Sequence, residues 1–122
     1  MAALADFTPV DEVAELQVED RVEGTGAVVE QSDTVTCHYT GAIAASGEVF
    51  QSSHDFGQAI SFPLSGVIPG WTQGVPGMKV GGTRRLLIPA ELAYGSRPPY
   101  GSGIPADAAL VFDIELVAIE GK

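Results

Sequence analysis

The sequence predicts an α+β fold in which an antiparallel sheet packs around one short helix. Three observations support this prediction. The 122 residues include 15 glycines and 8 prolines, which is typical of a turn-rich β protein rather than of a helical bundle. Several short runs rich in β-branched and aromatic residues lie between turn signals. A single stretch, Ser65–Gly77, carries the start and stop signals of a helix.

The first predicted strand, Leu16–Val22, alternates only partly between apolar and polar residues, as an edge strand with one solvated face does. The strongest strand signal is Thr34–Thr40, which is dense in β-branched and aromatic residues. Its two-residue period places Val35, Cys37 and Tyr39 on the core face. Cys37 is therefore expected to be a buried structural thiol.

Further strands are predicted at Glu48–Ser53, Ile60–Leu64, Thr83–Ile88 and Leu110–Ile119. Pro63 indicates a sheet edge or a strand end, because proline cannot donate a ladder hydrogen bond. The last strand is expected to be central in the sheet. Its core face is predicted to carry Leu110, Phe112, Ile114, Leu116 and Ala118.

The predicted helix begins at Pro69, where the missing N–H removes a donor that would have no partner. Gly74 and Pro76 end it after barely two turns. So short a helix is not stable alone and must be held by packing. We expect Trp71 to provide that packing and to form the floor of a pocket; the alternative is that Trp71 is an ordinary core residue.

Three segments outside the predicted helix and strands remain to be interpreted. Residues 1–14 are assigned to an N-terminal extension and residues 15–122 to one domain. Within the extension, apolar residues three apart predict either a ragged helical turn or an arm lying on the domain. Pro89–Gly95 reads as a tight turn that presents Tyr94, and Ser96–Ala109 as a long loop stiffened by prolines. Such a loop in a compact domain is usually functional.

The charge balance excludes several partners. Six basic residues face 16 acidic ones, for a net charge of −10, which repels nucleic acid and anionic membrane surfaces. The single cysteine cannot form an internal disulfide. Met1–Ala5 is too short for a signal sequence, so we expect a cytoplasmic monomer; the alternative is a periplasmic or secreted protein whose signal sequence has been removed.

Three short patterns resemble phosphate-binding or catalytic motifs, but none of them predicts such a site. The G-T-G at Gly24–Gly26 follows no buried strand and precedes no helix, so it does not predict a phosphate loop. Cys37 and His38 are strand neighbours on opposite faces and cannot act as a nucleophile and its base. His54-Asp55 lies beside two serines, but catalytic triads are assembled in space rather than from neighbours.

What remains is a set of inward aromatic and aliphatic residues from strands, helix start and loop. We expect them to form an apolar cradle with two phenol hydroxyls and a backbone N–H, a site for something apolar. The set is Tyr39, Phe50, Phe62, Val67, Ile68, Trp71, Tyr94 and Phe112.

These residues lie in a series of motifs: H-Y-T-G at His38–Gly41, V-F-x-S-S at Val49–Ser53, G-V-I-x-G-W-x-x-G at Gly66–Gly74, M-x-V-G at Met78–Gly81, A-Y-G at Ala93–Gly95, I-P at Ile104–Pro105, and L-V-F-D-I-E-L at Leu110–Leu116. In this order, over roughly Leu16 to Ile119, the chain resembles the FKBP-type peptidyl-prolyl cis/trans isomerases. The resemblance implies a strongly bent antiparallel sheet of five or six strands wrapped around one short helix.

The resemblance also implies a function, an isomerase of X–Pro bonds that needs neither cofactor nor metal. Its partners would be proline-containing polypeptides and macrolides such as rapamycin or tacrolimus. The implied catalytic residues are Tyr39, Phe50, Trp71, Tyr94 and Phe112. The implied substrate-binding residues are Gln51, Ile60, Val67 and Ile68, with the Ile68 N–H and the Tyr94 hydroxyl as hydrogen-bond donors.

Three positions depart from the family pattern. Gln51 stands where the family commonly has Asp, Phe56 where it has Arg, and Ile60 where an aromatic residue is common. The polar side of the pocket is therefore more neutral than usual, and tight macrolide binding is less expected. Besides the isomerase, two hypotheses stay open: a binding module for proline-containing segments with incidental catalysis, and a chaperone for apolar segments.

Overall fold

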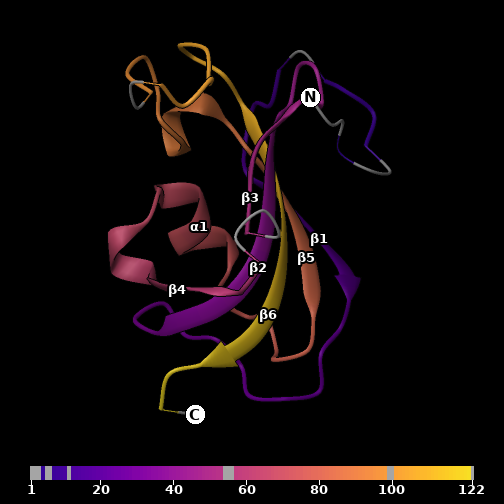
Figure 1. The fold of residues 1–122 in the computed structure, drawn as a ribbon, viewed down its shortest axis with the longest axis vertical. Helices are drawn as coiled ribbons and strands as arrows, with labels where there is room; N and C mark the ends of the chain where they lie inside the picture. The colour runs from indigo at the N-terminus through magenta and orange to yellow at the C-terminus, as the bar shows by residue number, and fades with distance from the viewer. Residues whose placement is uncertain (1–3, 5–6, 11, 54–56, 99–100, 122) are drawn as a thin grey trace.

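The computed structural model describes residues 4, 7–10, 12–53, 57–98 and 101–121. One sheet of six strands bends around one short helix (Figure 1). Its elements are β1 Gln17–Val22, β2 Thr34–Ile43, β3 Val49–Ser52, β4 Ile60–Pro63, α1 Pro69–Gly74, β5 Thr83–Ile88 and β6 Leu110–Ile119, with 3-10 turns η2 Leu64–Gly66 and η3 Ala90–Leu92. The predicted α+β class and the upper strand number are confirmed. Within the described part of the chain, no helix is long and apolar enough to cross a membrane.

All strand pairs are antiparallel, in the order β1-β5-β6-β2-β3, with β4 also paired to β2. The ten-residue strands β2 and β6 form the centre, from Val35 opposite Ile119 to Ile43 opposite Leu110. β1 lies at one edge, as predicted, but all six of its residues are exposed, whereas the partial alternation predicted a single solvated face. The other edge of β2 is shared: β4 occupies one end and β3 the other.

Helix α1 lies on β5 through two glycines one turn apart. A Cβ atom on Gly70 would lie 2.5 Å from Ile88 Cγ2, and one on Gly74 would lie 2.8 Å from Leu86 Cδ2. Glycine at both positions therefore lets the helix backbone approach the sheet closely. Pro69 occupies the first helical turn, as predicted. Trp71, the residue after Gly70, is then carried into the space between helix and sheet.

Arg84 secures the C-terminal end of α1 to the sheet edge. Its Nη1 donates to the carbonyl oxygens of Gly74 (2.8 Å) and Pro76 (3.2 Å). Its Nε donates to Asp20 of β1 at 2.6 Å. A buried guanidinium thus satisfies helix-end carbonyls that have no intrahelical partner and is itself neutralised by a carboxylate.

The N-terminal segment packs on the outer face of the sheet, opposite α1 (Figure 1). Leu4 joins a small apolar cluster with Ala42 and Val111, and its N–H bonds the Gly47 carbonyl at 2.8 Å. Phe7 lies against the same cluster. The Arg85 guanidinium lies over the Phe7 ring, with its Cζ atom 5.6 Å from the ring centroid. Of the two interpretations of this segment, the arm is the one that its described residues adopt.

One detail of β6 was predicted wrongly. Ala118 was placed on the core face, but it is exposed, and Ile119 is buried instead. The register between β2 and β6 shifts here, with Thr36 opposite Ala118 and Cys37 opposite Leu116, so Val117 is an extra residue. A β-bulge of this kind reverses the alternation beyond it, and a strict two-residue period cannot anticipate that.

We predict that Gly70→Ala destabilises the fold. The new methyl group would meet the branched side chain of Ile88, which is fully buried and has no room to yield. Overpacking of this kind costs about 1–3 kcal/mol of unfolding free energy, measured by urea denaturation. Gly66→Ala is the matched control: its methyl would lie 3.4 Å from Pro63 Cγ, an ordinary contact, and should change stability by less than about 0.5 kcal/mol. Equal losses in the two variants would contradict the close-approach argument.

We also predict that Cys37 makes the fold sensitive to alkaline pH. Burial raises the pKa of its thiol from 9.0 to about 12. The folded state therefore keeps the proton while the unfolded state loses it, and the free energy of unfolding falls as pH rises from about 9 toward 12. Urea titrations at neutral pH and about one pH unit above the unfolded pKa should show this loss. In Cys37→Val the loss should be clearly smaller; an unchanged loss would assign it to other groups.

Candidate functional site

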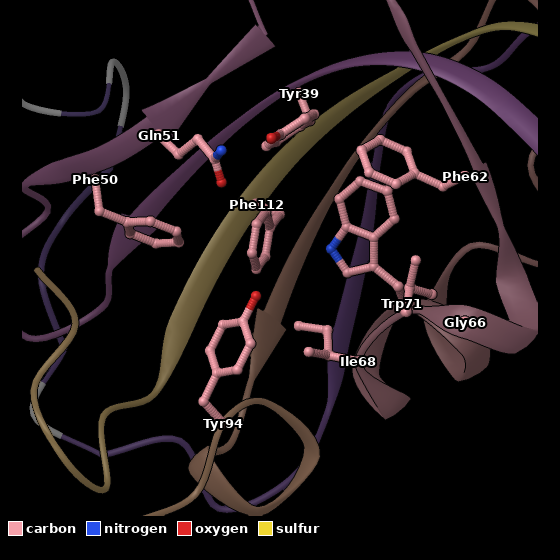
Figure 2. A pocket seen from close by; sticks show the side chains of 10 residues that line it. Tyr39, Phe50, Gln51, Phe62, Gly66, Ile68, Trp71, Tyr94 and Phe112 are labelled. Carbon is pink, nitrogen blue, oxygen red and sulfur yellow. The ribbon is translucent and has the colours of Figure 1, made fainter. Parts of the chain in front are cut away.

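A pocket of about 410 Å³ opens between the concave face of the sheet, the start of α1 and the turn after η3. Its walls come from segments far apart in the sequence, and nearly every side chain is aromatic or aliphatic (Figure 2). The lining residues are Tyr39, Phe50, Gln51, Phe62, Gly66, Val67, Ile68, Trp71, Tyr94 and Phe112.

Four aromatic rings meet in the floor. Trp71 packs edge-to-face against Tyr39 (centroids 5.6 Å apart), Phe62 (5.2 Å) and Phe112 (5.4 Å). Tyr39 makes a further edge contact with Phe62 at 5.6 Å. Edge-to-face contacts add to the energy of area burial and fix the ring planes. The indole ring is buried, and its nitrogen points toward the pocket in Figure 2. The floor is therefore rigid and apolar, with one N–H at its surface.

Gly41, the glycine of H-Y-T-G, allows the next wall to form. A Cβ atom there would lie 2.7 Å from both Phe112 and Phe50 ring carbons. Because Gly41 has no Cβ atom, the two rings contact each other across β2, edge to face, with centroids 5.8 Å apart. This glycine therefore serves ring packing in the pocket wall.

A β-bulge in β3 brings two consecutive residues to the pocket. Gln51 lies opposite Gly41, whereas Val49 lies opposite Ala42, so Phe50 is an extra residue on this strand. Regular alternation would send Phe50 and Gln51 to opposite faces of the sheet. The bulge instead lets both side chains line the cavity, as Figure 2 shows.

The polar groups of the pocket are few and neutral. They are the Tyr39 and Tyr94 hydroxyls, the Trp71 indole N–H, the Gln51 amide and the Ile68 backbone N–H. None of these groups has a hydrogen-bond partner among the described residues, so all of them are available to a ligand. Burial is the main cause that raises the pKa of the Tyr39 phenol above its usual value, and the nearby Tyr94 raises it further. The phenol therefore stays a neutral donor.

Tyr94 is presented by a compact turn that starts at η3. The Ala90 carbonyl accepts hydrogen bonds from the N–H groups of Ala93 (3.0 Å) and Gly95 (2.9 Å). The turn thus holds Tyr94 with its hydroxyl directed at Phe112 across the pocket (Figure 2). Pro89–Gly95 therefore forms a tight turn that presents Tyr94, as the sequence predicts.

The part of the pocket lining that the structure describes holds no acid–base pair. Every described residue that lines the pocket is uncharged. No three histidine, cysteine, aspartate or glutamate side chains in the described ranges are placed to hold a metal ion. His38 lies outside the lining, as expected, and its Nδ1 bonds the Ser53 hydroxyl at 3.0 Å. The arrangement can enclose an apolar group and hydrogen-bond a carbonyl oxygen beside it.

Eight of the nine residues assigned from the resemblance come together in this pocket. Ile60 does not line it. It pairs with Cys37 and packs against the main core, and the aromatic residue of β4 that reaches Trp71 is Phe62, two positions later on the same face. Phe62 was found by its inward pattern, but Gly66 has no side chain to signal its place. His54, Asp55 and Phe56 lie outside the described residues.

Comparison with known proteins agrees with this geometry. The family model for FKBP-type peptidyl-prolyl cis-trans isomerase matches residues 26–117. The chain is 44% identical to an FK506-binding protein of Streptomyces anulatus over 93% of this chain and 94% of the relative. It is 48% identical to a probable FK506-binding protein of Corynebacterium glutamicum over 85% of this chain and 86% of the relative.

Solved structures give the same result. The crystal structure of AtFKBP13 aligns with a TM-score of 0.76 at 36% identity, covering 88% of this chain and 94% of that one. The crystal structure of FkpA from Escherichia coli aligns with a TM-score of 0.77 at 43% identity, covering 85% of this chain but only 47% of that one. Together with the aromatic pocket, these likenesses lead to one conclusion: this chain belongs to the family of FKBP-type peptidyl-prolyl cis-trans isomerases.

Proposed function

We propose that this protein accelerates cis/trans rotation of X–Pro bonds in flexible or unfolded chains by enclosing the prolyl ring in the pocket above Trp71. The observation that carries the proposal is a rigid aromatic cavity whose polar groups are all neutral donors or amides. Such a site suits a reaction that makes and breaks no covalent bond. Family membership gives the reaction class, and the roles of individual residues are our proposal.

The physical basis is the polarity of the rotating amide. Rotation about an amide bond faces a barrier of about 18–20 kcal/mol, because resonance must be broken. The twisted amide has lost much of its charge separation and is less polar than either planar form. An apolar cavity therefore destabilises the planar amide more than the twisted one. Catalysis requires this differential binding, and each ~1.36 kcal/mol gives about a tenfold rate increase.

The neutral donors position the substrate. In Figure 2 the side chains of Tyr94 and Ile68 lie on the far side of Phe112 from Gln51. A carbonyl next to the proline that accepts a bond from the Tyr94 hydroxyl or the Ile68 N–H would be held while the prolyl ring lies on Trp71. Such fixed donors accelerate rotation only to the extent that they bind the twisted amide better than the planar one.

Macrolide binding is the finer part of the proposal. Relatives carry the name FK506-binding protein, and the apolar floor that would hold such a ligand is complete here. Gln51 supplies an amide where the family commonly has a carboxylate, so a charge-assisted hydrogen bond is lost. We propose that the chain binds macrolides of the rapamycin or tacrolimus kind, with lower affinity than family members with that Asp.

We predict that Trp71→Ala lowers the acceleration of cis/trans exchange in a Leu-Pro peptide by about tenfold or more, since it removes the floor on which the prolyl ring would lie. Tyr94→Phe should lower it by a smaller factor, because it deletes one hydroxyl worth about 0.5–1.5 kcal/mol. Exchange is measured by NMR with and without enzyme. Phe7→Ala is the control: it removes an aromatic ring on the outer face of the sheet and should leave the exchange rate unchanged. A wild-type protein that binds the peptide without accelerating exchange would leave only the binding-module hypothesis.

A second prediction separates an enzyme from a binding module tuned away from catalysis. In Gln51→Asp, we expect kcat/KM to stay within about threefold of wild type, because residue 51 is exposed and its new charge is screened by solvent. Gln51→Asn is the matched neutral control for side-chain length. The same NMR exchange assay measures all three proteins. A large gain in Gln51→Asp alone would mean that the natural residue suppresses turnover, which favours the binding module.

A further inference from the structure

The edge of β2 that faces β3 and β4 contains a gap directly beside the pocket. β4 pairs with residues 34–37 of β2, and β3 pairs with Thr40, Gly41 and Ala42. Between these two ladders lies Tyr39, whose ring forms part of the pocket floor. Its backbone N–H and C=O on this edge have no strand opposite them. Buried backbone groups of this kind need partners.

Two serine hydroxyls fill the gap. The Tyr39 N–H donates to Ser53 Oγ at 2.8 Å, and Ser53 Oγ donates back to the Tyr39 carbonyl at 3.3 Å. Ser52 Oγ donates to the same carbonyl at 3.3 Å and lies 3.0 Å from Thr40 Oγ1. Ser53 is fully buried, and its hydroxyl also bonds His38 Nδ1 at 3.0 Å. Side-chain hydroxyls thus continue the ladder where no strand does.

Both ends of this serine clamp (Ser52 and Ser53) lead to the pocket lining. On one side it holds the backbone of Tyr39. On the other it ends β3, the four-residue strand that carries Phe50 and Gln51 into the cavity. That strand is irregular, because the bulge at Phe50 interrupts its ladder with β2. A short strand with a bulge has few hydrogen bonds of its own, so the clamp is what fixes its end.

We propose that Ser53 is a positioning residue for the isomerase site: it sets the distance between Tyr39 in the pocket floor and the wall formed by Phe50 and Gln51, and thereby the affinity for substrate. Ser53 does not line the cavity and acts only through these neighbours. The proposal rests on the proposed function, since it concerns the affinity of the same pocket for proline-containing segments.

The expected consequence is a loss of binding rather than of turnover. Without the clamp, β3 samples positions in which the pocket is too wide, so only a fraction of molecules is competent to bind. The apparent dissociation constant rises by the reciprocal of that fraction, whereas saturating substrate restores the competent form. A purely structural role would lower stability and leave both constants unchanged in the folded protein.

The test compares Ser53→Ala with wild type, using a Leu-Pro peptide. The dissociation constant is measured by NMR titration, and the cis/trans exchange rate is measured at saturating peptide. We expect about a three- to tenfold rise in the dissociation constant, with the saturated rate within about twofold of wild type. A folded Ser53→Ala protein with unchanged affinity would overturn the proposal.

Two control variants separate positioning from stability. Val35→Ala removes buried apolar volume from the β4 end of the same strand, and Ser61→Ala removes a hydroxyl that bonds Thr36 at 2.8 Å across β2 and β4. Both should keep the wild-type affinity. An equal rise in Val35→Ala would assign the effect to general destabilisation and overturn the proposal.

A second variant covers a Ser53→Ala protein that does not fold. Ser52→Ala removes the other hydroxyl of the clamp, and its dissociation constant should rise in the same direction by a smaller factor. Wild-type affinity in Ser52→Ala would then overturn the proposal. Failure of the proposed function looks different: the wild-type protein itself would bind no peptide or would not accelerate exchange.

Discussion

The close contact between α1 and β5 is the constraint on which the pocket depends. Two glycines one turn apart let the helix backbone lie on Ile88 and Leu86, and only at that separation does Trp71 reach three other aromatic rings at once. The helix is too short to be stable alone, so its position is fixed by the same packing that forms the pocket floor. Fold stability and site geometry therefore share one set of contacts.

The buried charged side chains that the structure describes lie outside the pocket, where they form ion pairs. Arg84 ends the helix and pairs with Asp20, and Arg85 forms a two-point pair with Asp113 on the outer face of the sheet. Both guanidinium groups are buried, and each has its carboxylate within hydrogen-bond distance. The described residues that line the pocket, by contrast, offer only neutral groups. An apolar interior beside neutral donors is the environment that favours a less polar twisted amide over a planar one.

Much of the site could be predicted from the sequence because its residues lie on regular elements or in family motifs. The inward position of Tyr39 was predicted from the two-residue period of its strand. The place of Trp71 was predicted from the proline and glycine residues that begin and end its helix. The two-residue period fails where a bulge interrupts it. The bulge at Val117 reverses Ala118 and Ile119, so the core position predicted for Ala118 was wrong. The bulge at Phe50 brings Gln51 to the pocket as well, a place that was predicted from the family motif and not from the strand period. A bulge depends on the register with a partner strand, which no local pattern contains.

The sequence by itself determined the fold class, the strands and the helix, the neutral chemistry of the pocket and the family. These follow from local propensity, from residue type and from motif order. Only the tertiary structure decided that Ile60 lies outside the pocket, that the N-terminal arm covers the outer face, and that two serine hydroxyls close the gap beside Tyr39. Each of these is a contact between segments distant in the chain, and its geometry exists only once the sheet has bent around the helix.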